Sequence, residues 1–176
     1  SCKVDISTML TNWFVIKLKL MLIKLKNKDT LKFDDFILKC STGKNGIIFK
    51  KKEGDKCTPR GLFTFGKLYY RADRVKKPVS NIEAKIIKKD MGWCDDVASK
   101  FYNKEIKINK KIKHEKFFKK DNSYDYLIVI NYNTKNIRPS MGSAIFLHLT
   151  KNYKKTAGCV AVIKKDLLII LKLITK

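Results

Sequence analysis

Apolar residues in this chain occur in short runs that are bounded by glycine, asparagine, aspartate and lysine. Runs of about four to eight residues with such boundaries are typical of β-strands, because a helix needs a longer segment with a period of about 3.6 residues. The pattern therefore predicts a mostly β fold with a few peripheral helices. The clearest runs are LMLIKLK (20–26), DDFILKCSTG (34–43), YDYLIVINYN (124–133), GSAIFLHL (142–149) and GCVAVI (158–163).

The first two runs flank NKDT (27–30), and we expect them to form a β-hairpin about this turn. Two segments have helical patterns instead. KKDLLIILKLITK (164–176) has apolar residues at 167, 168, 170, 171 and 174, which predicts an amphipathic C-terminal helix from about Asp166 onward. KIKHEKFFKKD (111–121) is predicted to be a short helix.

A length of 176 residues is enough for one domain with a core of its own. We expect residues 21–176 to form this domain and residues 1–20 to be an N-terminal extension. The apolar segment 9–23 contains Lys17 and Lys19, so we do not expect it to span a membrane, which takes about 20 uninterrupted apolar residues. It also lacks a small-residue cleavage site after a clean apolar run, so it is a poor signal peptide.

The chain is strongly basic, with 40 lysines and arginines against 16 aspartates and glutamates and a formal net charge of +24. Only four of the basic residues are arginine, the side chain best suited to bidentate recognition of phosphates and base edges. We therefore expect a solvated lysine surface with nonspecific attraction to polyanions, and no specific nucleic-acid partner.

The five cysteines have neither CxxC spacing nor, with the two histidines, the spacing of a zinc site, so we predict no metal. Cys40 and Cys94 are expected to be small buried apolar residues. The alternative is a disulfide bridge, either Cys40–Cys94 or Cys57–Cys94, and the sequence does not decide whether one forms.

Cys159 and His148 are the candidates for catalysis. A cysteine nucleophile needs a base to form the thiolate, and His148 precedes it by eleven positions at the end of an apolar run. Gly158 allows close approach of the backbone to a tetrahedral intermediate, and backbone N–H groups near it are candidate oxyanion donors. The pair indicates thiol acyl transfer or peptide cleavage without a cofactor; the alternative is a buried cysteine near a hydrogen-bonded core histidine.

The segment SAIFLHLTKNYKKTAGCVAV (143–162) resembles the signature of the L,D-transpeptidase (YkuD-like) catalytic domain family, in which a histidine on a strand precedes a loop and a Ser/Thr-x-Gly-Cys sequence. STGKNGIIFKKKEGDKCTPRGLF (41–63) resembles the opening hairpin and the TPxGxF segment of the same family. The matching residues are His148, Thr156, Gly158 and Cys159 in the signature, and Thr58, Pro59, Gly61 and Phe63 in the second segment.

The resemblance implies a β-sandwich or barrel-like catalytic fold and a reaction on peptidoglycan stem peptides. Cys159 would attack the stem, release the terminal D-alanine and hold a thioester, with His148 as general base and acid and with Gly158 and Thr156 supporting the oxyanion. An amine acceptor then gives an L,D cross-link, whereas water gives a carboxypeptidase. The resemblance also implies a bacterial periplasmic or cell-envelope location, and we expect a monomer. A polyanion-binding protein without enzymatic activity is the rival class.

Five further residues are candidates for substrate binding. Tyr132 and Asn133 end a predicted strand and are expected either to line the cleft or to form a turn. Trp93 and Asp95 lie in an irregular segment, where they either position the stem peptide or cap a loop. Arg138 is a candidate source of positive charge, because Ala157 and Ala161 stand where many members of the family have a polar or basic residue.

Overall fold

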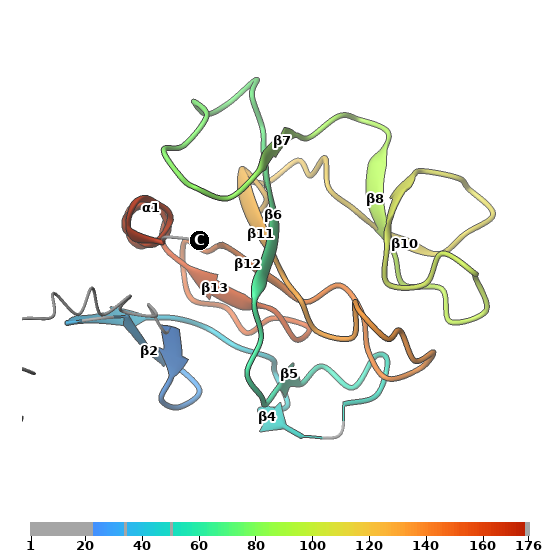
Figure 1. The fold of residues 1–176 in the computed structure, drawn as a ribbon, viewed down its shortest axis with the longest axis horizontal. Helices are drawn as coiled ribbons and strands as arrows, with labels where there is room; N and C mark the ends of the chain where they lie inside the picture. Colours follow the sequence, from blue (N-terminus) through green and yellow to red (C-terminus); the bar gives the residue numbers. More distant parts are fainter. Residues whose placement is uncertain (1–22, 34, 50, 175–176) are drawn as a thin grey trace, which may run out of the picture.

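The computed structural model describes residues 23–33, 35–49 and 51–174, so the predicted extension over residues 1–20 lies outside it. The described chain is mostly β with one C-terminal helix, which confirms the predicted fold class (Figure 1). The strands are β1 (Ile23–Leu25), β2 (Thr30–Phe33), β3 (Phe36–Lys39), β4 (Ile47–Ile48), β5 (Thr58–Pro59), β6 (Phe65–Tyr70), β7 (Ala84–Ile86), β8 (Met91–Cys94), β9 (Glu105–Lys107), β10 (His114–Lys116), β11 (Tyr126–Ile130), β12 (Phe146–Leu149) and β13 (Val160–Val162), and the helix is α1 (Lys164–Leu173).

A five-stranded sheet with the order β13-β12-β11-β6-β7 is the centre of the fold. Its outer pairs, β12 with β13 and β6 with β7, are parallel, whereas β11 pairs antiparallel with both of its neighbours. The other sheets are smaller, with the orders β1-β2-β3, β10-β8-β9 and β4-β5. In Figure 1, α1 and the sheet containing β8 and β10 lie on opposite sides of the central strands.

Alternation along the central strands gives this sheet two buried faces, because successive side chains of a strand point in opposite directions. One face forms what we call the helix-side core with α1, and the other forms the cleft-side core with loops and with β8. From the sheet, the helix-side core takes Leu68, Tyr70, Tyr126, Ile128, Leu147, Leu149, Val160 and Val162. The cleft-side core takes Tyr69, Leu127, Val129 and Phe146 from the sheet, and Trp93, Phe117, Tyr124 and Cys159 from outside it.

The C-terminal helix confirms the sequence prediction and begins two residues before Asp166. Leu167, Ile170 and Leu171 are its fully buried residues, and their spacing places them on one face. Asp166 lies in the first turn and Lys172 in the last, which is the charge arrangement that the helix dipole favours. The packing of Leu167, Ile170 and Leu171 fixes α1 against the helix-side core.

The predicted hairpin is present, but its second strand begins earlier than expected. β1 pairs with β2 directly, with Ile23 opposite Phe33 and Leu25 opposite Leu31, and the run at 36–39 forms a third strand on β2. Leu31 and Phe33 are buried, whereas Lys32 between them is exposed. A shift of one residue would expose both apolar side chains, so this alternation determines the register of β2 against its neighbours.

The prediction of a short helix over residues 111–121 is wrong. His114–Lys116 is the strand β10, which pairs antiparallel with β8 and sets Glu115 opposite Trp93. The physical reason is Phe117, which is fully buried in the cleft-side core and stacks on Trp93 at 6.3 Å between ring centroids. The extended chain places the Phe117 ring in the cleft-side core. The periodicity of the segment does not indicate this core, because most of the core's residues come from other parts of the chain.

The described cysteines Cys40, Cys57, Cys94 and Cys159 are all buried free thiols, so neither of the two alternative bridges is formed. Burial of Cys40 and Cys94 confirms their predicted role as small apolar residues. Within the described residues, no helix has the length and apolar character needed to cross a membrane.

Candidate active site

Two neighbouring parallel strands carry the candidate nucleophile and base. β12 contains His148, and Cys159 immediately precedes β13. The register sets Leu147 opposite Val160 and His148 opposite Ala161. Strands in register hold their side chains at fixed separations, so pairing of β12 with β13 brings together two residues that are eleven positions apart. Both line one cleft with a volume of about 950 Å³.

The Cys159 thiol lies at the inner wall of the cleft and is 8% exposed. Its Sγ donates to the Ala144 carbonyl at 3.3 Å and accepts from the Phe146 N–H at 3.4 Å. Burial raises the pKa of this thiol to about 12, and the Phe146 N–H offsets that effect only in part. Cys159 is therefore a neutral thiol at neutral pH until a base takes its proton.

The His148 imidazole is fixed by the backbone carbonyl of Leu149, which lies 2.9 Å from Nδ1. A carbonyl oxygen only accepts hydrogen bonds, so Nδ1 carries the proton and Nε2 keeps its lone pair. Burial lowers the pKa of His148 below its usual range, which keeps the ring neutral at pH 7. In the described part of the chain His148 and Cys159 share no hydrogen bond, so thiol and imidazole stand as a neutral pair.

The turn before Cys159 is fixed by Thr156. The Thr156 hydroxyl donates to the Cys159 carbonyl at 2.6 Å and accepts from the Gly158 N–H at 3.1 Å. Gly158 has a φ of 140°, and a Cβ at this position would lie 2.8 Å from the Cys57 carbonyl oxygen. The turn thus requires glycine, and the Gly158 N–H already has a partner within the turn.

Tyr132, Asn133 and Arg138 belong to one loop and do not line the cleft. The Tyr132 hydroxyl donates to the Met141 carbonyl at 2.6 Å. The Asn133 amide donates to the carbonyls of Arg138 and Gly142, and its Oδ1 accepts from the Arg138 N–H. The structure therefore gives Tyr132 and Asn133 contacts that hold the loop, while the Arg138 side chain is exposed outside the cleft.

Trp93 and Asp95 are close in sequence but differ in their surroundings. Trp93 is buried in the cleft-side core and its indole N–H donates to the Asn103 side chain at 2.8 Å. Asp95 lines the cleft, with Oδ2 3.7 Å from the Lys113 ammonium. Its Oδ1 is buried and has no hydrogen-bond partner among the described residues, and burial raises the pKa of this carboxyl.

Tyr124 and Glu115 also line the cleft with His148, and no sequence pattern indicated either of them as a site residue. The Tyr124 ring packs edge-on against the His148 ring at 5.2 Å between centroids. Its hydroxyl donates to Glu115 at 3.0 Å, and Glu115 also pairs with Lys119. Tyr124 follows a polar turn and Glu115 lies in the segment predicted to be helical, so only the tertiary packing brings them to the site.

A largely buried ion pair, Lys51 with Asp55, lies beside the cleft. Lys51 is 2% exposed and its ammonium lies 2.6 Å from Asp55. Glu53, two residues along, accepts hydrogen bonds from the Tyr102 and Ser143 hydroxyls. Both Lys51 and Glu53 line the cleft, so charged groups of each sign face the space in front of Cys159.

Among the described residues, no group of three or more histidine, cysteine, aspartate or glutamate side chains is arranged to hold a metal ion. The cleft is lined by the Cys159 thiol, the His148 imidazole and charged side chains of both signs.

Residues 11–176 match the sequence pattern of the L,D-transpeptidase catalytic domain family (YkuD). The match covers nearly the whole chain, including both segments that carry the resemblance noted from the sequence. No curated protein and no solved structure matches the chain.

Proposed function

Because this chain belongs to the L,D-transpeptidase catalytic domain family, we propose that it is a cysteine acyltransferase that acts on peptidoglycan stem peptides in the bacterial cell envelope. The family acts on peptidoglycan. The observation that carries the proposal for this chain is that Cys159 and His148 face one cleft from neighbouring parallel strands.

In the first step, His148 Nε2 takes the proton of the Cys159 thiol as Sγ attacks a carbonyl carbon of the donor stem. The tetrahedral intermediate then expels the terminal D-alanine, whose nitrogen receives that proton from His148. A thioester remains on Cys159. The neutral thiol and neutral imidazole support this order of events, because the proton moves when the substrate arrives and not before.

In the second step, a nucleophile releases the acyl group and restores the thiol. An amine of a second stem yields an L,D cross-link, with His148 accepting the proton of the amine and returning it to the sulfur. Water in place of the amine yields carboxypeptidase activity, which is the alternative within the family. Both outcomes use the same two side chains.

The remaining predicted residues act in support. Thr156 holds the Gly158 N–H and the Cys159 carbonyl, and so fixes the orientation of the nucleophile. Asp95 is the predicted binding residue that lines the cleft, and its carboxyl group suits an amine of a stem peptide. Lysines around the cleft suit the carboxylates of a stem: Lys51, Lys56, Lys113, Lys119, Lys151, Lys154, Lys155 and Lys164.

The test is incubation of the protein with purified muropeptides, followed by mass spectrometry of both protein and products. We expect wild type to form a covalent adduct at Cys159 and to release D-alanine, and Cys159→Ala to do neither. Cys94→Ala is the matched control, because Cys94 is also a buried free thiol but lies outside the cleft. Turnover that persists in Cys159→Ala contradicts the proposal.

Carbapenems acylate thiols through a strained carbonyl and are known to target this family, so they test the nucleophile apart from the substrate. We expect a carbapenem to add one equivalent at Cys159. Labelling at Cys159 without any muropeptide turnover would uphold the nucleophile and contradict the proposed substrate.

A nonspecific polyanion-binding role is the second candidate, and the net charge of +24 favours it. If this were the whole function, muropeptides would be bound but not converted, and Cys159→Ala would behave as wild type does.

A further inference from the structure

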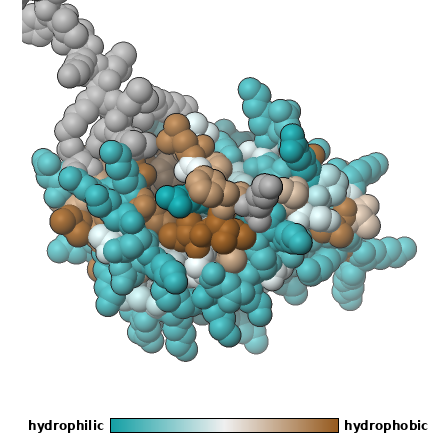
Figure 2. Space-filling view, turned by 90° about the horizontal axis from the view of Figure 1, so that it is seen from below, coloured by the Kyte–Doolittle hydropathy of each residue, from teal (hydrophilic) through white to brown (hydrophobic). Residues whose placement is uncertain are grey.

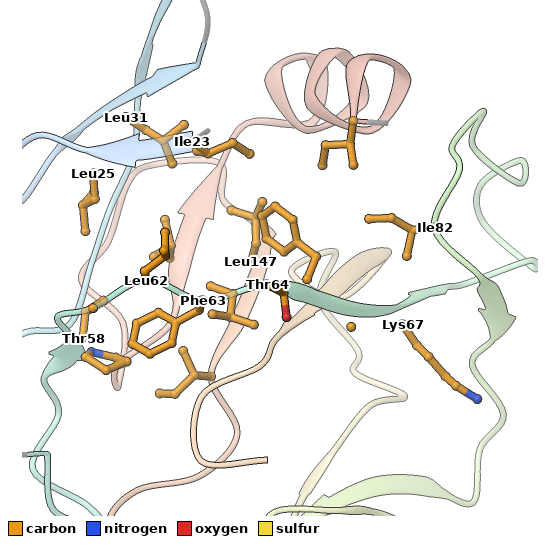
Figure 3. A pocket seen from close by; sticks show the side chains of 18 of the residues that line it. Ile23, Leu25, Leu31, Thr58, Leu62, Phe63, Thr64, Lys67, Ile82 and Leu147 are labelled. Carbon is orange, nitrogen blue, oxygen red and sulfur yellow. The ribbon is translucent and has the colours of Figure 1, made fainter. Parts of the chain in front are cut away.

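Positive charge is spread over this protein, so recognition of one anionic group needs a site with defined neighbours. Hydrophilic side chains surround the apolar surface on the face shown in Figure 2, and the net charge is +24. The groove of about 900 Å³ shown in Figure 3 is lined mainly by apolar side chains, and its charged residues Lys67 and Glu83 pair with each other at 3.1 Å. The cleft in front of Cys159 is lined instead by charged side chains of both signs.

The lysines of the cleft differ in their exposure and in their freedom to bind. Lys51 is buried and paired with Asp55. Lys119 is about one-third exposed. The remaining cleft lysines are exposed: Lys56, Lys113, Lys151, Lys154, Lys155 and Lys164. Water and salt screen an exposed ammonium, so a half-buried lysine that is still accessible attracts a carboxylate more strongly.

Lys119 lies beside the proposed catalytic base. Its ammonium lies 4.4 Å from the centre of the Tyr124 ring, and this ring packs edge-on against the His148 ring at 5.2 Å between centroids. Burial is the main cause of the lowered pKa of His148, and among charged side chains Lys119 lowers it most. Because the effect of a charge falls with distance, this influence agrees with the contact that both groups make with one ring.

Glu115 is the partner of Lys119 in the free protein. Each side chain of this ion pair is about one-third exposed, and Glu115 also accepts a hydrogen bond from the Tyr124 hydroxyl at 3.0 Å. A partly exposed ion pair is weak, because water solvates both partners. The long, flexible stem of a lysine also lets its ammonium move, so Lys119 is free to exchange Glu115 for a carboxylate of a bound ligand.

The proposed reaction brings a carboxylate to this side of the cleft. His148 gives its proton to the nitrogen of the departing D-alanine, so this nitrogen lies within hydrogen-bond distance of Nε2 in the reacting complex. The amine and the carboxylate of D-alanine share one α-carbon, which places the carboxylate oxygens about 3 Å from the nitrogen. The leaving carboxylate and Lys119 are therefore both neighbours of the His148 ring.

We propose that Lys119 binds the carboxylate of the terminal D-alanine of the donor stem and so makes the site specific for stems with a free C-terminus. This inference rests on the proposed function, because it names the group by which that site recognises its donor. Binding of the carboxylate also neutralises the charge that lowers the pKa of His148, so the ring becomes a stronger base once the donor is in place.

The test compares two synthetic donor stems, one ending in D-alanine and the other in D-alaninamide. Mass spectrometry measures kcat/KM for release of D-alanine or of its amide. We expect wild type to prefer the free acid by about 10-fold or more, and Lys119→Gln to lose most of this preference. The ratio of the two substrates is taken within each variant, so a change in the folded fraction cancels.

Two further variants separate substrate binding from general charge and from support of the cleft wall. Lys120→Gln removes the same charge from an exposed neighbour outside the cleft and should keep the preference of wild type. Glu115→Gln should raise the preference, because Lys119 then has no competing carboxylate. A structural ion pair would instead give the same fall in Glu115→Gln as in Lys119→Gln.

The proposal is overturned by any of three results. These are an unchanged preference in Lys119→Gln, an equal fall in Lys120→Gln, and an equal fall in Glu115→Gln. Each of them leaves the proposed function standing, because the protein still releases product. Release of neither product by wild type would overturn the proposed function and this inference together.

Discussion

The protonation state of Cys159 gives a quantitative prediction about its reactivity. Burial raises the pKa of this thiol from 9.0 to about 12. At any pH below 9, the thiolate fraction is then about 1,000-fold lower than that of the same residue in the unfolded chain. A more basic thiolate is also more nucleophilic, and this higher intrinsic reactivity raises the rate by about 20-fold, which offsets part of the loss in thiolate fraction. The net expectation is a reaction with a small disulfide about 50-fold slower in the folded protein.

The assay is labelling with dithiodipyridine from pH 6 to 9, in which mass spectrometry follows the peptide that contains Cys159 in native and in urea-unfolded protein. The native rate should rise about tenfold for each pH unit across this range, because the thiolate remains a minor species throughout. The substrate reaction differs, since His148 accepts the proton directly, and its rate should fall as pH drops through the pKa of His148. A native labelling rate that is independent of pH near neutrality, or faster than in the unfolded chain, would show a stabilised thiolate and refute this reasoning.

Four other predictions concern single residues or the net charge of the whole chain. His148→Ala should lower turnover by about 100-fold or more through loss of the base, whereas His114→Ala, which lies outside the cleft, should retain most activity when both are assayed with muropeptides. Gly158→Ala should cost about 1–3 kcal/mol in urea unfolding, because the Cβ meets the Cys57 carbonyl oxygen at 2.8 Å and the φ of 140° is unfavourable for alanine; an unchanged midpoint would contradict this. Burial raises the pKa of Cys40 from 9.0 to about 11, so the stability that its protonated form contributes should be complete below pH 9 and lost as the pH rises through 11, and Cys40→Ala should flatten this decline. Retention on anionic polymers should weaken steeply with salt for every sequence of DNA tested; tight binding of one sequence at high salt would contradict nonspecific attraction.

The sequence by itself determined the fold class, the C-terminal helix and the identity of the family. Each of these depends on local information: short apolar runs, the spacing of Leu167, Ile170 and Leu171, and a signature of residues close along the chain. His148 and Cys159 were also candidates from the sequence, since a strand and a turn at fixed spacing place them near each other. These local patterns predict the structure correctly because the apolar residues that they identify are buried in the core.

Only the tertiary structure decided what surrounds the two residues. Tyr124 packs against His148, and Glu115 accepts a hydrogen bond from Tyr124, although neither segment has an apparent link to His148 in the sequence. The segment that carries Glu115 is a strand, not a helix, because pairing with β8 buries Phe117. For Tyr132 and Asn133 the sequence left open whether they line the cleft or form a turn, and in the structure their side chains donate hydrogen bonds to loop carbonyls. The protonation states of Cys159 and His148 likewise depend on burial by side chains that are distant in sequence. The sequence of one strand does not specify which residues pack against it, so these states could not be predicted from the sequence.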